Sequence, residues 1–166
     1  FGSRIKALLF NSATVGVTLI LGGLVILLVE RSSRAIRFRS VDDVPLRTGI
    51  LIGLAQAVSM IPGTSRSGAT IIGGLLLGLD RRAATEFSFF LAIPTMAAAF
   101  AYEAYKARDS LDFSSAGLVA AGFVAAFVSA LVIVRPFLEF VARVGFAPFA
   151  YYRVGLGTLV LTLLFV

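Results

Sequence analysis

A polar run at residues 62–68, PGTSRSG, interrupts an otherwise apolar part of the chain. The flanking stretches, residues 48–61 and 69–79, carry no charged side chain. Each is well short of the roughly 20 residues that an α-helix needs to cross a bilayer. At membrane depth, irregular backbone and an arginine persist only where they line a buried or water-filled site. The run therefore predicts a functional site at the tip of a helix–turn–helix.

The composition favours a membrane protein. Hydrophobic residues make up 58% of the chain and charged residues 14%, against about 25% in a typical soluble domain. The net charge of +6 comes mostly from arginines in short segments between apolar runs, which is typical of juxtamembrane positions. Basic and aromatic residues are not interleaved as in nucleic-acid readers, so no nucleic-acid partner is expected. The chain has no cysteine and no histidine, which excludes thiol and imidazole chemistry from these residues.

The apolar segments predict an all-α, polytopic membrane helix bundle that forms a single transmembrane domain over residues 1–166. A re-entrant helix–turn–helix is expected at residues 48–79. Pro94 predicts a kink within one of the spans. Residues 135–145 are expected to form a short amphipathic connection. The predicted membrane spans are residues 7–29, 83–105, 113–134 and 148–166.

The positions of the basic residues predict the orientation of these spans. The loop at residues 30–47 holds five arginines and is expected to be cytoplasmic. A hairpin that enters and leaves on one face returns Arg81 and Arg82 to that side. The next two spans then place residues 106–112 outside and Arg135 inside. A hairpin that crossed fully would put Arg81 and Arg82 outside, where basic residues fit less well.

The polar run has the chemistry of an anion site. Pro62 ends the first half-helix, Gly63 permits a sharp turn, and either Thr64 or Ser65 is expected to cap the second half-helix. Free amides at a helix start attract anions, and Arg66 adds a fork that binds phosphate oxygens. Further hydrogen-bond donors are expected from the hydroxyls of Ser65, Ser67 and Thr70. Phosphate is the leading candidate. The alternative, a kinked helix with an arginine that reaches the interface, does not explain the hydroxyls and glycines.

Three other polar residues have simpler interpretations. Glu86 is expected to pair with Arg82 at i,i+4, although it is also a candidate for the site. Gln56 lies midway along the first half-helix and needs a partner if it is buried. Arg153 follows two tyrosines and is interpreted as an anchor at the membrane interface, with an inward ion pair as the alternative.

Several motifs together resemble one known family. The segments GLAQ at 53–56, PGTSRSGAT at 62–70, GGLLLG at 73–78, EFSFFLAIP at 86–94 and FAYYR at 149–153 are similar to those of the undecaprenyl-diphosphate phosphatases, also called bacitracin-resistance proteins. The resemblance covers essentially the whole chain. It implies an enzyme of the bacterial inner membrane that hydrolyses undecaprenyl diphosphate to undecaprenyl phosphate and phosphate. That reaction recycles the lipid carrier for peptidoglycan synthesis.

The resemblance also implies a fold, site residues and partners. The family fold has two inverted-topology repeats, is usually dimeric and opens its site towards the periplasm. Ser65 and Arg66 match the catalytic phosphate-contacting pair. The neighbouring substrate-binding positions that match are Gly63, Thr64, Ser67, Gly68 and Thr70. A divalent ion, Mg²⁺ or Ca²⁺, is implied, but the family's glutamate-rich Glu-x-x-x-Glu motif and its Ser-Gly-His element have no counterpart here. We therefore expect one half of an inverted repeat, with no metal ligands of its own.

Two other functional classes remain open on the residues alone. Broken helices at the bilayer midplane are common in transporters, so a transporter or lipid flippase with an anion site is the main alternative. A membrane scaffold without catalytic activity is a weaker one. Phosphate release from a lipid diphosphate, compared with vesicle uptake or lipid flip, separates the three.

Overall fold

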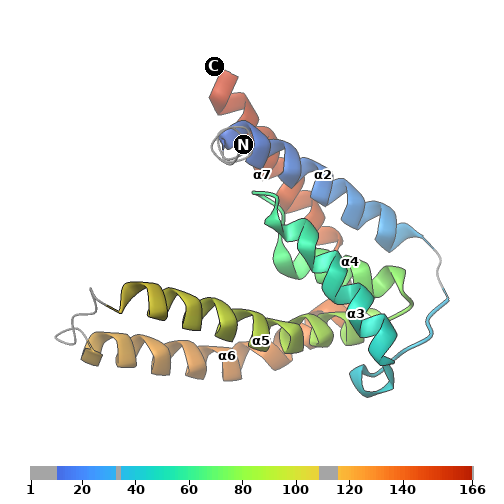
Figure 1. The fold of residues 1–166 in the computed structure, drawn as a ribbon. Helices are drawn as coiled ribbons and strands as arrows, with labels where there is room; N and C mark the ends of the chain where they lie inside the picture. The colour runs from blue at the N-terminus through green and yellow to red at the C-terminus, as the bar shows by residue number, and fades with distance from the viewer. Residues whose placement is uncertain (1–10, 33–34, 109–115, 166) are drawn as a thin grey trace.

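The computed structural model describes residues 11–32, 35–108 and 116–165, and within them every element longer than an isolated bridge is helical. Four helices are long and apolar enough to cross a membrane. The prediction of an all-α, multi-pass membrane protein is confirmed (Figure 1). In chain order the elements are α2 (Ser12–Arg31), the 3₁₀ helix η1 (Val41–Asp43), α3 (Leu46–Ala55), the 3₁₀ helix η2 (Gln56–Met60), α4 (Arg66–Leu76), α5 (Arg81–Ala107), α6 (Ala116–Val144) and α7 (Ala147–Phe165).

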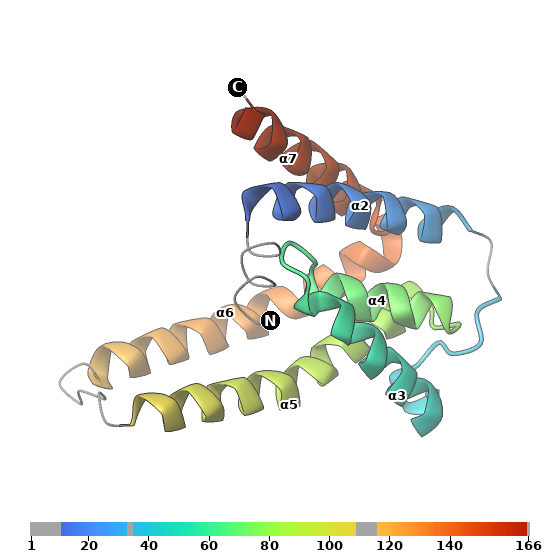
Figure 2. The ribbon, with the colours of Figure 1, turned by 45° about the horizontal axis from the view of Figure 1, so that its top comes forward.

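Helices α2 and α7 form a close antiparallel pair (Figures 1 and 2). Glycines of α2 permit the close approach. A Cβ atom on Gly16 would lie 2.7 Å from Cγ of Leu161, and one on Gly23 would lie 2.7 Å from Cγ2 of Val154. Small residues at such positions let two membrane helices pack backbone to backbone. The pair forms one wall of the site.

The helix–turn–helix lies between this pair and the two remaining helices (Figure 2). At 1.5 Å per residue, α3 and α4 are each about 15–17 Å long, roughly half the hydrocarbon thickness. The first half is α-helical only to Ala55, where η2 takes over up to Met60. A 3₁₀ helix rises about 2.0 Å per residue, so it carries the chain further towards the turn. The first half-helix is therefore helical up to Met60, with its last five residues in the 3₁₀ form.

Helices α5 and α6 form a second antiparallel pair, which projects away from α2 and α7 (Figure 2). Helix α5 is continuous through Pro94. Helix α6 is also continuous, through Pro136, so the predicted separate connection at residues 135–145 is wrong. Arg135 and Glu139 form an i,i+4 pair at 3.6 Å, and the Arg135 side chain is 90% exposed. The charged segment is thus an extension of the helix, which at 29 residues is about 44 Å long.

The connecting segments meet at one end of the molecule, where hydrogen bonds and an ion pair join them. The segment before η1 pairs with the turn after α4: the amides of Arg37 and Phe38 donate to the Gly78 carbonyl at 2.8 and 3.1 Å, and the Asp80 amide donates to the Phe38 carbonyl at 3.0 Å. Glu30, at the end of α2, forms an ion pair with Arg81 at 2.9 Å. The loop before α3 and the turn after α4 therefore lie on the same side of the molecule.

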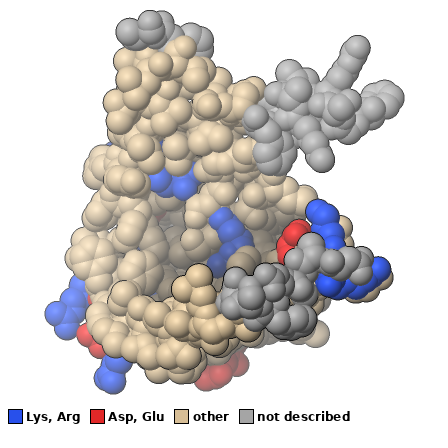
Figure 3. Space-filling model, turned by 90° about the vertical axis from the view of Figure 1, so that its left-hand side faces the viewer, with Lys and Arg blue, Asp and Glu red and all other residues tan. Residues whose placement is uncertain are grey.

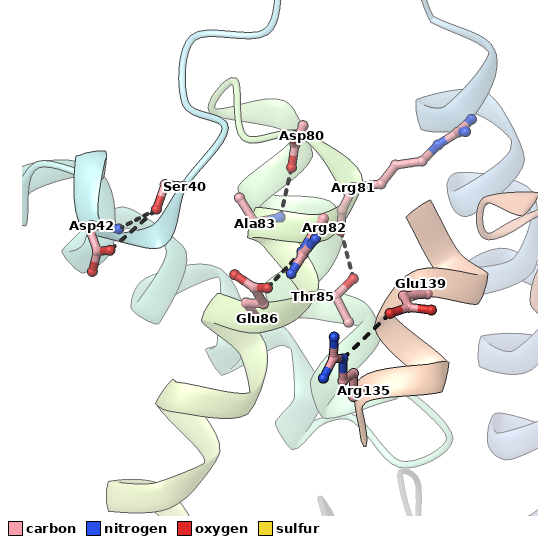
Figure 4. A network of polar contacts seen from close by, with 10 residues as sticks. All are labelled: Ser40, Asp42, Asp80, Arg81, Arg82, Ala83, Thr85, Glu86, Arg135 and Glu139. Carbon is pink, nitrogen blue, oxygen red and sulfur yellow. Dashed lines mark hydrogen bonds and ion pairs between the residues drawn. The ribbon is translucent and has the colours of Figure 1, made fainter. Parts of the chain in front are cut away.

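Figure 4 shows polar side chains from η1, the start of α5 and the later part of α6 gathered in this region. Asp80 caps α5, with its Oδ1 accepting from the Ala83 amide at 2.7 Å. Arg82 donates from Nε to Glu86 Oε1 at 2.9 Å. Such a polar end is suited to one face of a membrane, with the apolar helices extending away from it.

This arrangement predicts the outcome of a labelling experiment. Because the chain has no cysteine, the variants Arg39→Cys, Arg82→Cys and Lys106→Cys can be labelled singly with a membrane-impermeant thiol reagent in oriented vesicles. Positions 39 and 82 are expected to be labelled from one side and position 106 from the other, since a re-entrant hairpin returns to its face of entry. Labelling of positions 39 and 82 from opposite sides would mean that residues 48–79 cross the membrane fully.

Candidate functional site: the start of helix α4

The polar run forms a tight turn followed by a capped helix start. Gly63 has φ +83°, a left-handed conformation that glycine adopts without strain, and the Thr64 amide donates to the Ile61 carbonyl at 3.0 Å. Of the two predicted caps, Ser65 takes the role: its Oγ accepts from the Gly68 amide at 3.1 Å. The turn thus leads directly into α4, and the first amides of this helix face the tip of the hairpin.

The start of α4 is electrically positive. The amides of Arg66 and Ser67 precede the first intrahelical hydrogen bond, which runs from the Ala69 amide to the Ser65 carbonyl at 2.9 Å. Unpaired first-turn amides and the helix dipole together favour a bound anion. The hydroxyls of Ser65 and Ser67 lie 3.1 Å apart. Two hydroxyls and two amides without an intrahelical partner therefore belong to the same helix start.

Arg66 adds a cation that has no counter-ion among the described residues. Its Nη1 is buried and has no hydrogen-bond partner among the described residues. The ion pairs that the structure shows between described residues join Arg81 to Glu30, Arg82 to Glu86 and Arg135 to Glu139, and none involves Arg66. A buried donor on a charged group that lacks a partner is costly. Arg66 is thus available to bind an anionic ligand.

Two cavities flank the start of α4, and Ser65, Gly68 and Arg153 line both. The first, about 240 Å³, is closed by aromatic side chains that include Phe137, Phe149 and Tyr152, and Ser67 also lines it. The second, about 410 Å³, is almost wholly aliphatic, and Thr64 lines it. Arg66 lines neither. Figure 3 shows basic side chains within a hollow whose surroundings are mostly uncharged residues.

Thr70 is placed differently from the prediction. Its side chain is only 1% exposed, and its Oγ1 lies 2.7 Å from Oγ of Ser88 on α5. The hydroxyl therefore joins α4 to α5 within the protein and does not face either cavity. The physical reason is tertiary packing, because Thr70 lies on the face of α4 that meets Ser88 of α5.

Two further predicted candidates also lie away from the cavities. Glu86 pairs with Arg82, as the i,i+4 spacing predicted, and its carboxylate is used at the polar end of the molecule. Gln56 lies where α3 changes to η2. Its Nε2 is 3.5 Å from Oγ1 of Thr95 on α5, and its Oε1 is buried without a partner among the described residues.

Arg153 is the site residue that the sequence interpretation missed. The favoured interpretation of Arg153 was an anchor at the membrane interface, with an inward ion pair as the alternative. Its Nη2 does point inwards, but it donates to the Gly63 carbonyl at 3.0 Å and forms none of the ion pairs described above. The guanidinium therefore points inwards, to the turn itself. The sequence signal for this role is an arginine in the second turn of an apolar helix. In the structure this arginine lies opposite Gly22, and a Cβ atom added to Gly22 would lie 2.6 Å from Nη2 of Arg153.

The described residues do not contain the donors of a metal centre. Within the ranges 11–32, 35–108 and 116–165, no group of three or more His, Cys, Asp or Glu side chains could hold a metal ion. The nearest acidic side chain in sequence to the polar run, Asp80, is used as a helix cap. The site as built is cationic and suited to an anion.

Comparisons with known proteins agree with this chemistry. The sequence profile of the family described as "Bacitracin resistance protein BacA" matches residues 1–159. A protein named undecaprenyl-diphosphatase from Methylococcus capsulatus is 56% identical over 161 residues, which is 97% of this chain and 59% of the relative. Undecaprenyl-diphosphatase 2 of Rhodospirillum rubrum is 55% identical with the same coverage, and undecaprenyl-diphosphatase of Dechloromonas aromatica is 53% identical. The chain thus spans about three fifths of the length of these relatives. It belongs to the bacitracin resistance protein BacA family.

Proposed function

We propose that this chain forms the diphosphate-binding half of an undecaprenyl-diphosphatase, an enzyme that hydrolyses undecaprenyl diphosphate to undecaprenyl phosphate and phosphate. The observation that carries the proposal is Arg66 at the positive start of α4, because its buried Nη1 has no hydrogen-bond partner in the described part of the chain. The names of the relatives support the same reaction. A transferred phosphoryl group needs mostly positioning and charge neutralisation, and this site supplies both.

The roles of the residues follow from the geometry. The amides of Arg66 and Ser67 and the helix dipole hold the phosphate oxygens, and the guanidinium of Arg66 neutralises charge that develops on them. Ser65 keeps the helix start rigid, because its Oγ accepts from the Gly68 amide, and its proton remains available to donate to a phosphate oxygen. Thr64 and Ser67 extend the donor set towards the two cavities.

The two cavities suit the polyprenyl tail. Both adjoin Ser65 and both are lined mainly by aliphatic and aromatic side chains. A polyprenyl tail that extends from the diphosphate into these cavities is removed from water, and it brings no polar group of its own that would need a partner. The surrounding membrane lipids cover the remaining apolar helix faces.

The family also implies a divalent ion, Mg²⁺ or Ca²⁺, and the described residues do not fit one. Such ions prefer several carboxylate oxygens, which are not gathered at the start of α4. Any metal ligands must therefore come from outside these residues, and no step of the proposed mechanism passes through the ion. The same holds for an acid–base histidine, since the chain has none.

The location and assembly are part of the proposal. A multi-pass protein with bacterial relatives fits the bacterial inner membrane, and a site that serves recycling of a cell-wall lipid carrier would face the periplasm. The polar end with Glu30 and Arg81 would then be cytoplasmic, in keeping with its excess of basic residues. A homodimer follows from the family resemblance.

The experiment that tests the proposal compares two activities of the protein extended to the full length of its relatives. The purified protein in liposomes that contain undecaprenyl diphosphate is expected to release inorganic phosphate at a rate that saturates with substrate. A protein that instead moves the lipid or an anion across the bilayer, with no phosphate release, would be a flippase or transporter, and the hydrolase assignment would be wrong.

A further inference from the structure

The turn at the tip of the hairpin is held by side chains from two helices that are distant in sequence. Thr18 Oγ1 of α2 lies 2.7 Å from the Pro62 carbonyl oxygen, and Arg153 Nη2 of α7 lies 3.0 Å from the Gly63 carbonyl oxygen. The Thr18 hydroxyl also lies 2.9 Å from the Thr14 carbonyl oxygen. A hydroxyl has one proton to donate, and the Pro62 oxygen is the nearest acceptor.

Glycines make room for both contacts. A Cβ on Gly22 would lie 2.6 Å from Arg153 Nη2, so any larger residue there would displace the guanidinium. A Cβ on Gly63 would collide with Thr18 Oγ1 and lie 2.9 Å from the Val15 backbone. The turn is therefore seated directly on α2, and the arginine reaches it past the glycine of α2.

Arg153 carries a charge that no carboxylate among the described residues neutralises. The ion pairs described above do not include it, and its Nε is buried without a partner in the described part of the chain. Its acceptors are backbone carbonyls, at 3.0 Å for Gly63 and 3.5 Å for Thr18. The buried guanidinium of Arg153 loses its hydration and gains only carbonyl dipoles in return, which is costly. Its positive charge also raises the electrostatic potential beside Ser65.

We propose that Thr18 and Arg153 form a carbonyl clamp that positions the Pro62–Gly63 turn for diphosphate binding. The clamp directs the two carbonyl oxygens towards α2 and α7. Oxygens turned towards the start of α4 would repel a phosphate, whereas the amides and hydroxyls at that start would bind one. Both are positioning residues, and the inference rests on the proposed function for the identity of the anion.

The first test is kinetic and uses the full-length protein. Thr18→Val, which keeps the shape but lacks the hydroxyl, is expected to raise KM for undecaprenyl diphosphate about tenfold, because a turn carbonyl loses its donor. Arg153→Met is expected to raise KM about a hundredfold, since a charge is lost as well. Inhibition by inorganic diphosphate should weaken by the same factors. Thr18→Ser should behave like wild type, and Arg153→Lys should recover part of the loss.

Two matched controls separate the clamp from general damage. Thr158→Val removes a hydroxyl of α7 that bonds within its own helix at 2.8 Å to the Val154 carbonyl, and Arg135→Met removes an exposed arginine. Both should leave KM and diphosphate inhibition unchanged. If Thr18→Val and Arg153→Met lowered only the amount of folded enzyme, with KM and inhibition as in wild type, the clamp would have no positioning role.

The second test does not depend on activity. A spin label at Ile61→Cys, next to the turn and 40% exposed in the wild type, reports the mobility of the tip. Thr18→Val and Arg153→Met should narrow its spectrum, and Thr158→Val should not. An unchanged spectrum in both clamp variants would overturn the proposal. If the spectrum responds while the wild-type protein releases no phosphate, the clamp stands and the hydrolase assignment fails.

Discussion

Arg66→Ala in the full-length protein is expected to abolish most of the phosphate release from undecaprenyl diphosphate. Loss of a desolvated charge that contacts phosphate costs about 2 to 5 kcal/mol, which corresponds to roughly 30- to 4,000-fold in kcat/KM. The fold should survive, because Arg66 forms no ion pair with a described residue and its Nη1 has no partner to lose. The measurement is kcat/KM of purified enzyme at equal folded concentration.

Arg66→Lys distinguishes a fork from a point charge. Lysine keeps the charge but cannot donate two parallel hydrogen bonds, so the variant should also be strongly impaired. Arg135→Ala is the matched control, since that arginine is 90% exposed and its pair with Glu139 is at the surface, where such pairs contribute little. A lysine variant with near-normal turnover would contradict bidentate binding by Arg66.

The local features of the fold were predictable because local rules govern them. Ser65 and Asp80 cap helices that begin after them, as short polar side chains ahead of apolar runs do. Glu86 pairs with Arg82 one turn away for the same local reason. Four apolar helices follow from length and hydropathy alone. These inferences needed no knowledge of tertiary contacts.

The error at residues 135–145 shows where charge misleads. Two arginines, a glutamate and Pro136 resemble a connection, yet α6 continues to Val144. A proline within a helix removes one backbone hydrogen bond and leaves the rest, while the i,i+4 pair supports the turn that contains it. Polarity therefore does not mark the end of this helix, and the buried residue of α6, Val141, lies within the charged stretch.

The site was predicted only in part because half of it is built by distant segments. The motif itself identified Ser65 and Arg66, but Thr18 and Arg153 reach the turn from positions 44 and 90 residues away in sequence. No local pattern fixes such contacts. The contact of Thr70 with Ser88 was missed for the related reason that the sequence does not say which face of α4 meets α5.

The residues of this chain are expected to bind phosphate without hydrolysing the lipid. They include no histidine, and their described part gathers no set of carboxylates for a metal. The donors of the proposed anion site, Arg66 and the start of α4, lie within these residues. Without the remaining two fifths of the relatives' length, water reaches it and weakens every electrostatic contact. Binding of inorganic phosphate should therefore be weak but measurable, and it should be lost in Arg66→Ala.

The most direct measurement compares phosphate release by this chain alone with release by the same chain after fusion to, or co-expression with, the missing part of a relative. Both are purified from a host that lacks its own enzymes of this kind and are assayed on undecaprenyl diphosphate with and without a chelator. We expect no turnover by the chain alone and chelator-sensitive release by the completed protein. Turnover by the isolated chain at the rate of the completed protein would contradict the split site and would place the catalytic groups within these residues, at Ser65 or Glu86.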